Sequence, residues 1–485
     1  MNQPIARLFS VVLVMFALLV AFTSRWTVFD ASALRANPNN SRPGLEAQYV
    51  QRGAIVAADQ TALAESVRGK DGIYTRQYPF GALFAHAIGY YDPYNGRTAL
   101  ESSNNGVLAG SPPQQGSILH QFAGKRTNGD EVVTTLDEHA QQVAYAALAG
   151  RTGAVVAIVP GTGAIKVFAD SPTYDPNQVK TRAGFAAIQA QPNGPLVDRV
   201  TAGQYAPGST FKVVTAIAAI DAGRYTPNSV FSGKSPIVVS GQPLANDSGT
   251  SYGNVTLSTA LTFSINTVWA QVALGVGAPT LQTYMNRLGF YSKPLIDLPA
   301  DEVLPSGVRY NARPGYLPVT SGADLGRVGI GEGGLEVTPL QMAMVAAAVA
   351  NNGRLMVPHL TKEILNPDGQ VVQTTEPRLY STVMKASTAQ EVGLMMENVV
   401  NDGTGTQAAL AGVRVAGKTG TAQDCTNPAV PACAKSQVWF IAYAPVNHPT
   451  IAIAVTLEHQ IGFGGSIAAP IAKAVLEALH VGAAG

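Results

Sequence analysis

Three short strings in the sequence carry side chains that could perform nucleophilic acyl transfer. They combine serine, lysine and hydrogen-bonding groups: Ser209-Thr210-Phe211-Lys212, Ser264-Ile265-Asn266 and Lys418-Thr419-Gly420-Thr421. A serine hydroxyl is a weak nucleophile until a neighbouring base takes its proton. Residues three apart share one face of a helix, so we expect Lys212 to lie beside the hydroxyl of Ser209. The first string therefore predicts a serine nucleophile with a lysine base.

A lysine base must be uncharged, which requires a lowered pKa. Burial, the positive end of a helix and a second cation at Lys418 would each lower the pKa of Lys212. Ser264 could then pass the proton to a leaving amine. Asn266 could hydrogen-bond either Lys212 or a substrate amide. The three strings are thus expected to converge on one site.

The third string predicts a strand that docks substrate. An extended peptide could add to this strand, with Gly420 allowing a close approach. The side chains of Lys418, Thr419 and Thr421 could bind a carboxylate. We expect the backbone N–H groups of Ser209 and Thr421 to form an oxyanion hole.

Each string also has an ordinary structural explanation. Ser209 could cap a helix, and Lys212 could be a lysine that reaches solvent. Residues 264–266 could interrupt a helix, and 418–420 could be an edge strand with a bulge. However, the segment 209–222 is apolar on nearly all sides, so an unpaired lysine there would be costly.

Apolar patterns and turn residues predict the elements that position these strings. Pro207-Gly208 and Gly223 bound a buried helix over 209–222, and residues 256–274 are mostly helical. Residues 130–148 begin as a strand and become a helix, with Thr135 or Asp137 as N-cap. Further strands are expected at 153–159, 164–170, 413–423, 438–446 and 450–459, and further helices at 339–350 and 467–480. Because the last three strands are contiguous, the fold class is α+β, with an antiparallel sheet flanked by helices.

The N-terminal stretch predicts a single membrane span. Residues Leu8–Ser24 are uncharged and mostly apolar between Arg7 and Arg25, and Trp26 follows as an interfacial anchor. A helix of this length covers about 25 Å, close to the roughly 30 Å of a bilayer core. A cleaved secretory signal is the alternative, because residues 31–33 (Ala-Ser-Ala) fit a cleavage site. In either case we expect the bulk of the chain outside the cytoplasm, at the cell membrane.

Composition excludes several classes of protein. The chain has 32 Lys+Arg and 31 Asp+Glu, a net charge of +1, so nucleic acid is not an expected partner. Hydrophobic residues make up 46% of the 485 positions, which excludes disorder for most of the chain. The seven histidines form no metal-binding motif, so neither a metal nor another cofactor is expected. Cys425 and Cys433 bracket a short loop and are a candidate disulfide in an oxidising space, with two free thiols as the alternative.

The strings and their surroundings resemble the class B penicillin-binding proteins, in particular the actinobacterial (mycobacterial-type) penicillin-binding protein A group. The resemblance covers nearly the whole chain. Outside the three strings it rests on Arg52-Gly53-Ala54-Ile55, His86 to Tyr90, Leu100-Glu101, Tyr174 to Asn177, Tyr205 to Gly208, Gly329 to Gly333, Val337 to Gln341, Trp439-Phe440 and Gly465 to Pro470. Ile265 and Gln437 depart from the pattern. Many relatives carry His at the latter position, so any role for that His is absent.

The resemblance implies a penicillin-binding transpeptidase fold with a small strand-rich N-terminal module. The expected domains are a cytoplasmic tip and membrane anchor over 1–26, a linker and dimerisation-like module over 27–145, and a transpeptidase domain over 146–485. The segment before residue 146 is too short for a glycosyltransferase domain, so we expect a monofunctional enzyme.

The resemblance also implies an activity, D,D-transpeptidation. Ser209 would attack the D-Ala-D-Ala carbonyl of a peptidoglycan stem peptide, and an amine of a neighbouring stem would resolve the acyl-enzyme. β-Lactams would acylate the same serine. The implied partners are stem peptides, β-lactams, the membrane and membrane proteins of cell division or elongation.

Other functions remain open from the sequence. A D,D-carboxypeptidase would use the same serine, with water in place of the amine. A β-lactamase would need a carboxylate that activates water, but the best string, 363–366 (Glu-Ile-Leu-Asn), is more typical of a strand entering a turn. A β-lactam sensor would need a cytoplasmic module, for which the segment before residue 8 is too short. A divisome scaffold would not need Ser209, Lys212 and Lys418 together.

Overall fold

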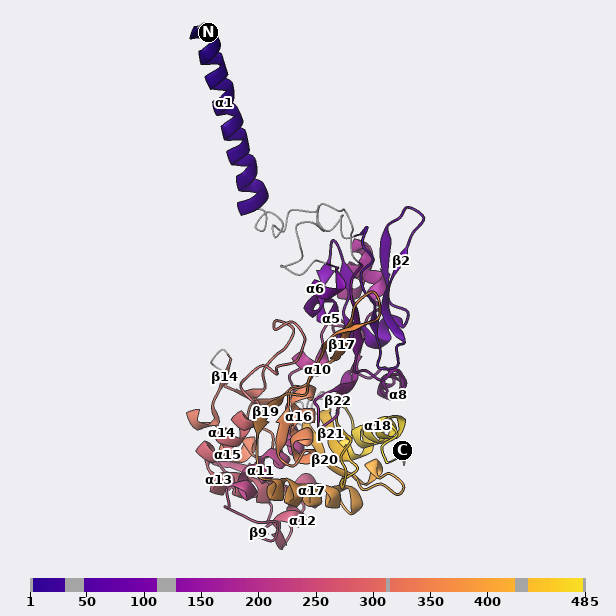
Figure 1. Ribbon diagram of the computed structural model, residues 1–485. Coiled ribbons are helices and arrows are strands. Elements are labelled where there is room, and N and C mark those ends of the chain that lie inside the picture. The colour runs from indigo at the N-terminus through magenta and orange to yellow at the C-terminus, as the bar shows by residue number, and fades with distance from the viewer. Residues whose placement is uncertain (1–2, 31–47, 111–127, 311–314, 424–434, 483–485) are drawn as a thin grey trace.

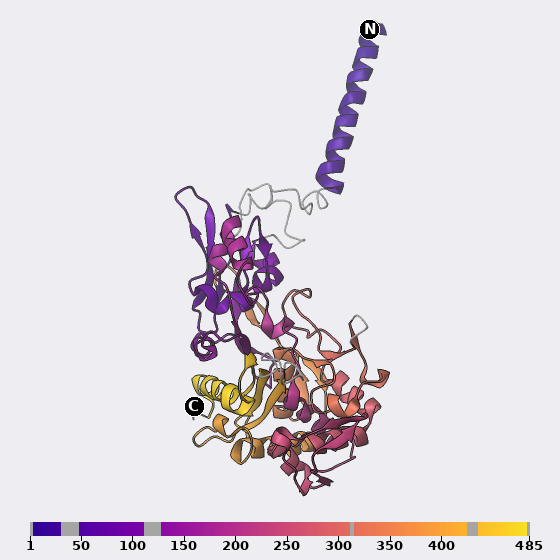
Figure 2. The same ribbon diagram turned by 180° about the vertical axis from the view of Figure 1, so that it is seen from behind.

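The computed structural model describes residues 3–30, 48–110, 128–310, 315–423 and 435–482 (Figure 1). Cys425 and Cys433, and the cleavage-site residues 31–33, lie outside these ranges. In both views the N-terminal module lies between the N-terminal helix and the larger C-terminal part of the chain (Figures 1 and 2).

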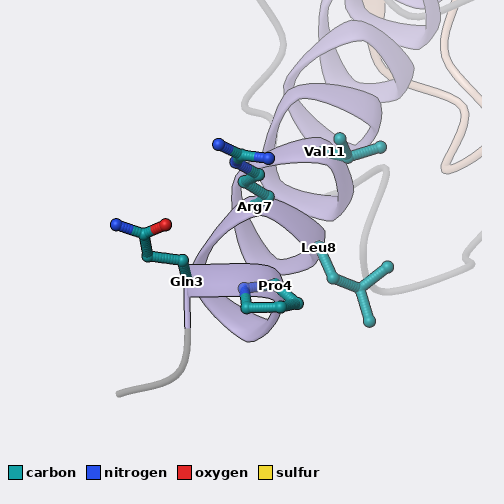
Figure 3. Close-up of a pocket in the computed structure, with 5 residues that line it drawn as sticks. All are labelled: Gln3, Pro4, Arg7, Leu8 and Val11. Atoms are coloured by element: carbon teal, nitrogen blue, oxygen red, sulfur yellow. The ribbon is translucent and has the colours of Figure 1, made fainter.

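The first helix, α1 (Gln3–Ser24), contains the predicted span and buries none of its residues. Together with a following π-helical turn, Arg25–Phe29, it is the one helix among the described residues that is long and apolar enough to cross a membrane. Figure 3 shows a recess beside its first turns, lined by Gln3, Pro4, Arg7, Leu8 and Val11. A single helix lines this recess, so we assign it no functional site.

A five-stranded antiparallel sheet forms the centre of the C-terminal part. Its order in space is β20-β21-β22-β7-β8, which confirms the strands predicted at 153–159 and 164–170 and the three contiguous C-terminal strands. The strands are β7 (Gly153–Ile158), β8 (Ile165–Ser171), β20 (Ala416–Gln423), β21 (Ser436–Ala444) and β22 (Ile451–Gln460). β20 is an edge strand of this sheet.

Helices cover both faces of this sheet, which explains why its strands are almost continuously apolar. Successive strand residues point to opposite faces, so Val156 enters one core and Val155 the other. Helix α16 (Pro339–Ala350) packs on the first face and is buried on all sides. Helices α8 (Glu138–Leu148) and α18 (Gly464–Ala478) pack on the second. Asp137 is the N-cap of α8, because its side chain accepts a hydrogen bond from Ala140 N at 2.9 Å.

Further helices build the region beside β20, at the bottom of Figure 1. The predicted helix over 209–222 is present as a 3-10 turn, η4 (Gly208–Phe211), followed by α11 (Lys212–Asp221). The expected helical stretch 256–274 is two helices, because the chain breaks at residues 263–265. This region contains α12 (Leu257–Thr262), α13 (Asn266–Val276), α14 (Ala278–Arg287), α15 (Leu325–Val328) and α17 (Ala386–Asn401).

Smaller elements complete the C-terminal part. The short strands are β9 (Val230–Ser232), β10 (Ile237–Val239), β11 (Gln242–Leu244), β12 (Asn254–Thr256), β13 (Gly307–Arg309), β14 (Tyr316–Leu317), β15 (Leu335–Glu336), β16 (Arg354–Met356) and β19 (Leu379–Thr382). The short helices are η3 (Pro176–Lys180), α9 (Arg182–Gln189), α10 (Arg199–Ala202), η5 (Asp247–Gly249), η6 (Val319–Ser321) and η7 (Thr406–Ala408).

The N-terminal module contains a six-stranded sheet with the order β18-β17-β6-β1-β2-β3. Its strands are β1 (Ile55–Val56), β2 (Ala62–Arg68), β3 (Tyr74–Gln77), β6 (Glu131–Thr134), β17 (Thr361–Leu365) and β18 (Val371–Thr374). The predicted strand and turn at 363–369 are confirmed: Asn366 Oδ1 accepts from Asp368 N at 3.1 Å within the β17–β18 turn. The remaining short elements are β4 (Tyr91–Asp92), β5 (Gly96–Arg97), η2 (Gly81–Phe84), α4 (Ala85–Ile88), α5 (Ala99–Ser103) and α6 (Asn105–Leu108).

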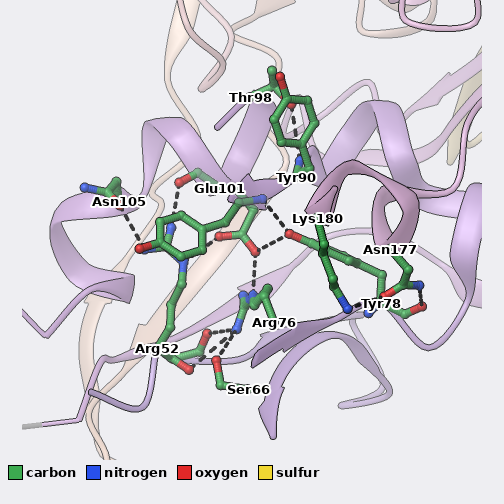
Figure 4. A network of polar contacts seen from close by, with 12 residues as sticks. Arg52, Ser66, Arg76, Tyr78, Tyr90, Thr98, Glu101, Asn105, Asn177 and Lys180 are labelled. Carbon is green, nitrogen blue, oxygen red and sulfur yellow. Dashed lines mark hydrogen bonds and ion pairs between the residues drawn. The ribbon is translucent and has the colours of Figure 1, made fainter. Parts of the chain in front are cut away.

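A buried ion network fixes this module (Figure 4). Glu101 is fully buried and accepts from Arg52 Nε and Arg76 Nε, each at 2.6 Å, and from the hydroxyl of Tyr78 at 3.2 Å. Burial opposes ionisation of Glu101, but the two guanidinium groups outweigh it and lower the pKa of this carboxyl. The network ties α5 to β3 and to the segment before β1.

Candidate active site

The segment that leads to Ser209 is anchored by the central sheet and by Val337. Tyr205 pairs with Val337 through two backbone hydrogen bonds of 3.0 and 2.8 Å. The hydroxyl of Tyr205 donates to Glu458 on β22 at 2.7 Å. Trp439 on β21 donates from its indole N–H to the carbonyl of Ala206 at 2.9 Å. These contacts hold the backbone immediately before Ser209 in a fixed position.

Gly208 brings Ser209 close to two other parts of the chain. Its φ of +50° and its surroundings exclude a side chain, since a Cβ there would lie 2.8 Å from Thr421 O and 3.1 Å from Thr421 N. On its other side, Gly208 N donates to Gly331 O at 3.1 Å. Ser209 therefore lies between strand β20 and the 329–334 loop, and its side chain is partly exposed.

Lys212 is fully buried one turn after Ser209, and its amine contacts the second string. Its Nζ lies 2.6 Å from Asn266 Oδ1, 2.7 Å from Ser264 O and 3.1 Å from Ser264 Oγ. Among the described residues Ser209 Oγ makes no hydrogen bond to Lys212 Nζ, so in this arrangement the amine is turned towards Ser264 and Asn266. The burial of Lys212 rules out the alternative of a surface lysine.

Ser264 bridges the two lysines. It lies in the break between α12 and α13 with a φ of +59°, a backbone conformation that few non-glycine residues adopt. Its Oγ is 3.1 Å from Lys212 Nζ and 2.9 Å from Lys418 Nζ. Lys418 is fully buried and also donates to Thr419 O at 3.0 Å. The helix break is therefore real, and it delivers a hydroxyl to both amines.

Burial lowers the pKa of both lysines, and repulsion by Lys418 lowers that of Lys212 further. For Lys212 burial is the larger cause, the nearby Lys418 adds to it, and the pKa falls well below that of a free lysine. Burial lowers the pKa of Lys418 to about 7. An uncharged amine at Lys212 is therefore accessible at neutral pH.

Strand β20 forms one wall of the site with an open edge. Gly420 passes close to the nucleophile segment, since a Cβ there would lie 2.7 Å from Pro207 O. Thr419 Oγ1 contacts Thr404 Oγ1 at 2.6 Å, and Thr421 Oγ1 accepts from Gly464 N at 3.2 Å. The threonine side chains of this edge strand are thus held in place.

The structure also places one residue that the sequence patterns did not single out, Thr404, and two that they did, Glu363 and Gln437. Thr404 orients Thr419, and only its place between two glycines could have indicated a tight turn there. Glu363, the carboxylate considered for a β-lactamase, lies on β17 in the other sheet and pairs with Lys362. Gln437 is buried and donates to Thr456 Oγ1.

A family description, the penicillin binding protein transpeptidase domain, matches residues 153–477. The chain belongs to the penicillin-binding protein transpeptidases. A second description, the penicillin binding protein A dimerisation domain, matches residues 52–132 of this penicillin-binding protein.

Individual relatives place it among the class B members. It is 34% identical to the peptidoglycan D,D-transpeptidase PbpA of Mycolicibacterium smegmatis over 99% of both chains. It is 32% identical to PbpA of Mycobacterium tuberculosis, again over 99% of both chains. The penicillin-binding protein A structure from M. tuberculosis, a ceftriaxone acyl-enzyme complex, has a TM-score of 0.81 at 31% identity, covering 90% of this chain and 99% of that chain. The resemblance stated from the sequence is thereby confirmed, as is the fold class.

Proposed function

We propose that this penicillin-binding protein is a monofunctional peptidoglycan D,D-transpeptidase that works through an acyl-enzyme at Ser209. The observation that carries the proposal is that Ser264 Oγ lies within hydrogen-bond distance of both Lys212 and Lys418, with Lys212 one helical turn from a partly exposed serine. The family match to the transpeptidase domain supports the same reaction.

The proton positions fit a neutral Lys212. An uncharged amine has two N–H donors and one lone pair. Donation to Ser264 O and Asn266 Oδ1 uses both donors and leaves the lone pair to accept from Ser264 O–H. Ser264 Oγ in turn accepts from Lys418 Nζ. Rotation of the Ser264 O–H away from Lys212 frees that lone pair, and rotation of Ser209 χ1 towards Lys212 then lets the Ser209 hydroxyl proton pass to it.

The reaction follows in two acyl transfers. Ser209 Oγ forms a bond to the penultimate D-Ala carbonyl, and its proton passes to Lys212. The C–N bond to the terminal D-Ala breaks, and the leaving nitrogen takes a proton relayed through Ser264. An amine from a second stem then attacks the ester, forms the cross-link and returns a proton to Ser209.

Strand β20 and helix η4 supply binding and charge stabilisation. We assign donor-peptide binding to the open edge of β20, with Lys418, Thr419 and Thr421 meeting the terminal carboxylate. Gly420 permits the close approach of strand and nucleophile segment. The N–H groups of Ser209 and Thr421 are the oxyanion donors, each worth about 3 kcal/mol in a preorganised site.

We also propose where the protein lies in the cell and how its chain divides into domains. We assign α1 as a single-pass membrane anchor, with the peptidoglycan-facing part outside the cytoplasm and membrane proteins of cell division or elongation as partners. We further assign 1–26 to the anchor, 27–145 to a linker and dimerisation-like module, and 146–485 to the transpeptidase domain. The β-lactams are its inhibitors, as acylating analogues of the donor.

The experiment that tests this function is a two-substrate assay on the purified protein. We expect a synthetic stem pentapeptide donor and an amine acceptor to give a cross-linked product and free D-Ala, both measured by mass spectrometry. Ser209→Ala abolishes both products, while Ser103→Ala, an exposed serine on α5, leaves both unchanged. Cross-linked product at undiminished yield from Ser209→Ala would reject the proposal, and D-Ala release without any cross-link would make the protein a carboxypeptidase.

A further inference from the structure

The wall of the active site that faces β20 is formed by the 329–334 loop. Gly208 contacts Thr421 on one side and Gly331 on the other, where a Cβ on Gly331 would lie 1.8 Å from Gly208 O. Because Gly208 directly precedes Ser209, the loop and the strand flank the nucleophile from opposite sides. Strand β20 is assigned to the donor peptide, which leaves the loop side for a second substrate.

Glu332 is the residue that follows Gly331 on this loop, and its position is fixed by its backbone. Its N–H donates to Arg327 O at 2.9 Å, and its carbonyl accepts from Leu335 N at 3.3 Å. Its side chain is 43% exposed, so it is partly buried by the fold but still accessible to a ligand.

The charge around Glu332 is net negative. Its only ion pair among the described residues is with Arg327 Nη1 at 3.7 Å, and Arg327 also pairs through Nε with Asp324 at 3.3 Å. One guanidinium is thus shared between two carboxylates, which leaves one negative charge uncompensated. Asp247 on η5 is exposed and is a second carboxylate close enough to act on Lys212.

Glu332 acts on the active site through space and is not bonded to its base. Burial raises the pKa of Glu332 itself, and Lys212 lies close enough to pull that pKa down again. Conversely, Glu332 and Asp247 raise the pKa of Lys212, although burial and Lys418 outweigh them. The two walls of the site therefore carry charges of opposite sign, with Lys418 on the strand side and carboxylates on the loop side.

This difference matches the charges of the two substrates of a transpeptidase. The donor peptide ends in a carboxylate, and the acceptor brings an amine that is an ammonium group in water. We propose that the Glu332 carboxylate binds the acceptor ammonium at the loop side of Ser209 and so favours transfer to an amine over hydrolysis. The inference rests on the proposed function and names the acceptor subsite of the same centre.

Transfer of the acyl group to the acceptor removes two protons from the acceptor nitrogen. The bound ammonium gives one proton to solvent, and its nitrogen lone pair attacks the ester carbonyl. The new C–N bond forms, the bond between the acyl carbon and Ser209 Oγ breaks, and the second nitrogen proton passes through Lys212 to Ser209 Oγ. Glu332 is an acceptor-binding residue and takes no proton permanently.

The test is the partition of the acyl-enzyme between acceptors in the Glu332→Gln variant of the full chain. The acyl group comes from an N-acylated D-alanyl thioester, the cationic acceptor is Nα-acetyl-lysinamide and the uncharged acceptor is hydroxylamine. We expect the acceptor concentration for half-maximal transfer to the cationic amine to rise about two- to fivefold, the effect of losing one partly exposed charge pair. Transfer to hydroxylamine and acylation by a fluorescent penicillin stay unchanged.

Two further variants separate this subsite from a general structural effect. Glu336 lies on β15, and its carboxylate pairs with Arg309. Glu336→Gln removes that carboxylate and leaves transfer to either acceptor unchanged. Arg327→Gln removes the guanidinium that competes for Glu332, so it lowers the half-maximal concentration of the cationic amine. A merely structural role of the loop would not produce opposite changes.

The outcomes are distinguishable from failure of the proposed function. An unchanged concentration dependence for the cationic amine in Glu332→Gln, with normal acylation, overturns the acceptor subsite alone. An equal loss of transfer to hydroxylamine also overturns it, because an uncharged nucleophile gains nothing from a carboxylate. Absence of acylation in the parent protein overturns the acyl-enzyme and the subsite together.

Discussion

Replacing Lys418 by methionine tests how the second lysine controls the first. Both amines contact Ser264 Oγ, at 3.1 and 2.9 Å, so their nitrogens are at most about 6 Å apart. At an effective dielectric constant of about 20, two unit charges at this distance repel by about 3 kcal/mol, or about two pKa units. Lys418 has a pKa of about 7 and is therefore charged on the acidic side of neutrality, where Lys212 must lose its proton.

The sign of the effect follows from that repulsion. Removing the cation stabilises the protonated form of Lys212 and raises its pKa, so a higher pH is needed to make the amine a base. We expect the acidic limb of the acylation rate against pH to move up by about one to two units in Lys418→Met. The overall rate falls as well, because the donor carboxylate loses its partner.

The assay is the rate of labelling by a fluorescent penicillin between pH 4 and about 10, measured for the parent protein, Lys418→Met and Lys418→Arg. Lys418→Arg is the matched control, since it keeps a cation and should leave the acidic limb near its original position. A limb in Lys418→Met that stays in place, or moves to lower pH, would refute the view that repulsion between the lysines keeps Lys212 neutral.

Three other substitutions give separate expectations. Ser264→Ala removes the hydroxyl shared by both lysines and should slow penicillin acylation by about 10²- to 10⁴-fold, with unchanged circular dichroism; a fall of less than threefold would contradict the relay. Glu101→Gln leaves two buried guanidiniums without their counter-ion and should lower the free energy of unfolding by about 3–5 kcal/mol in urea denaturation; an unchanged midpoint would show that the network in Figure 4 is not stabilising. Gly331→Ala places a methyl group against Gly208 O at a φ of +89° and should slow acylation about tenfold or more; normal labelling would mean that the loop does not hold the nucleophile.

The elements that carry the site were largely predictable, because they depend on local patterns. The apolar run after Ser209 and the glycine at 223 indicated a buried helix, and η4 and α11 occupy that segment. Strand β7 was recognisable as a strand although both of its faces are buried. Its residues alternate between two cores, with Val155 in one and Val156 in the other.

Long-range geometry was not predictable from one sequence. Strands β17 and β18 join the sheet of the N-terminal module although they are far from it in the chain, and no local pattern encodes that pairing. The helix break at Ser264 was only one of two alternatives from the sequence. Ser264 has a φ of +59°, and a positive φ is difficult to predict at a residue that is not glycine. The contact between Thr404 and Thr419 joins two polar residues of common type, which periodicity cannot reveal.

The orientation of Lys212 is the most informative difference at the site. Helical spacing placed its amine beside Ser209, but the side chain is long enough to reach Ser264 and Asn266, which offer it three polar atoms. A buried amine takes the position with the most hydrogen-bond partners, because an unpaired one is costly. The three-residue spacing from Ser209 therefore predicted the position of Lys212 on the helix, whereas burial determines where its Nζ lies.

Peptide mapping by mass spectrometry after reaction with penicillin is the most direct test of the central claim. We predict one penicilloyl group per chain, attached to the peptide that contains Ser209, and none in Ser209→Ala. A label on any other residue, or labelling of Ser209→Ala to the parent level, would contradict the account of this site.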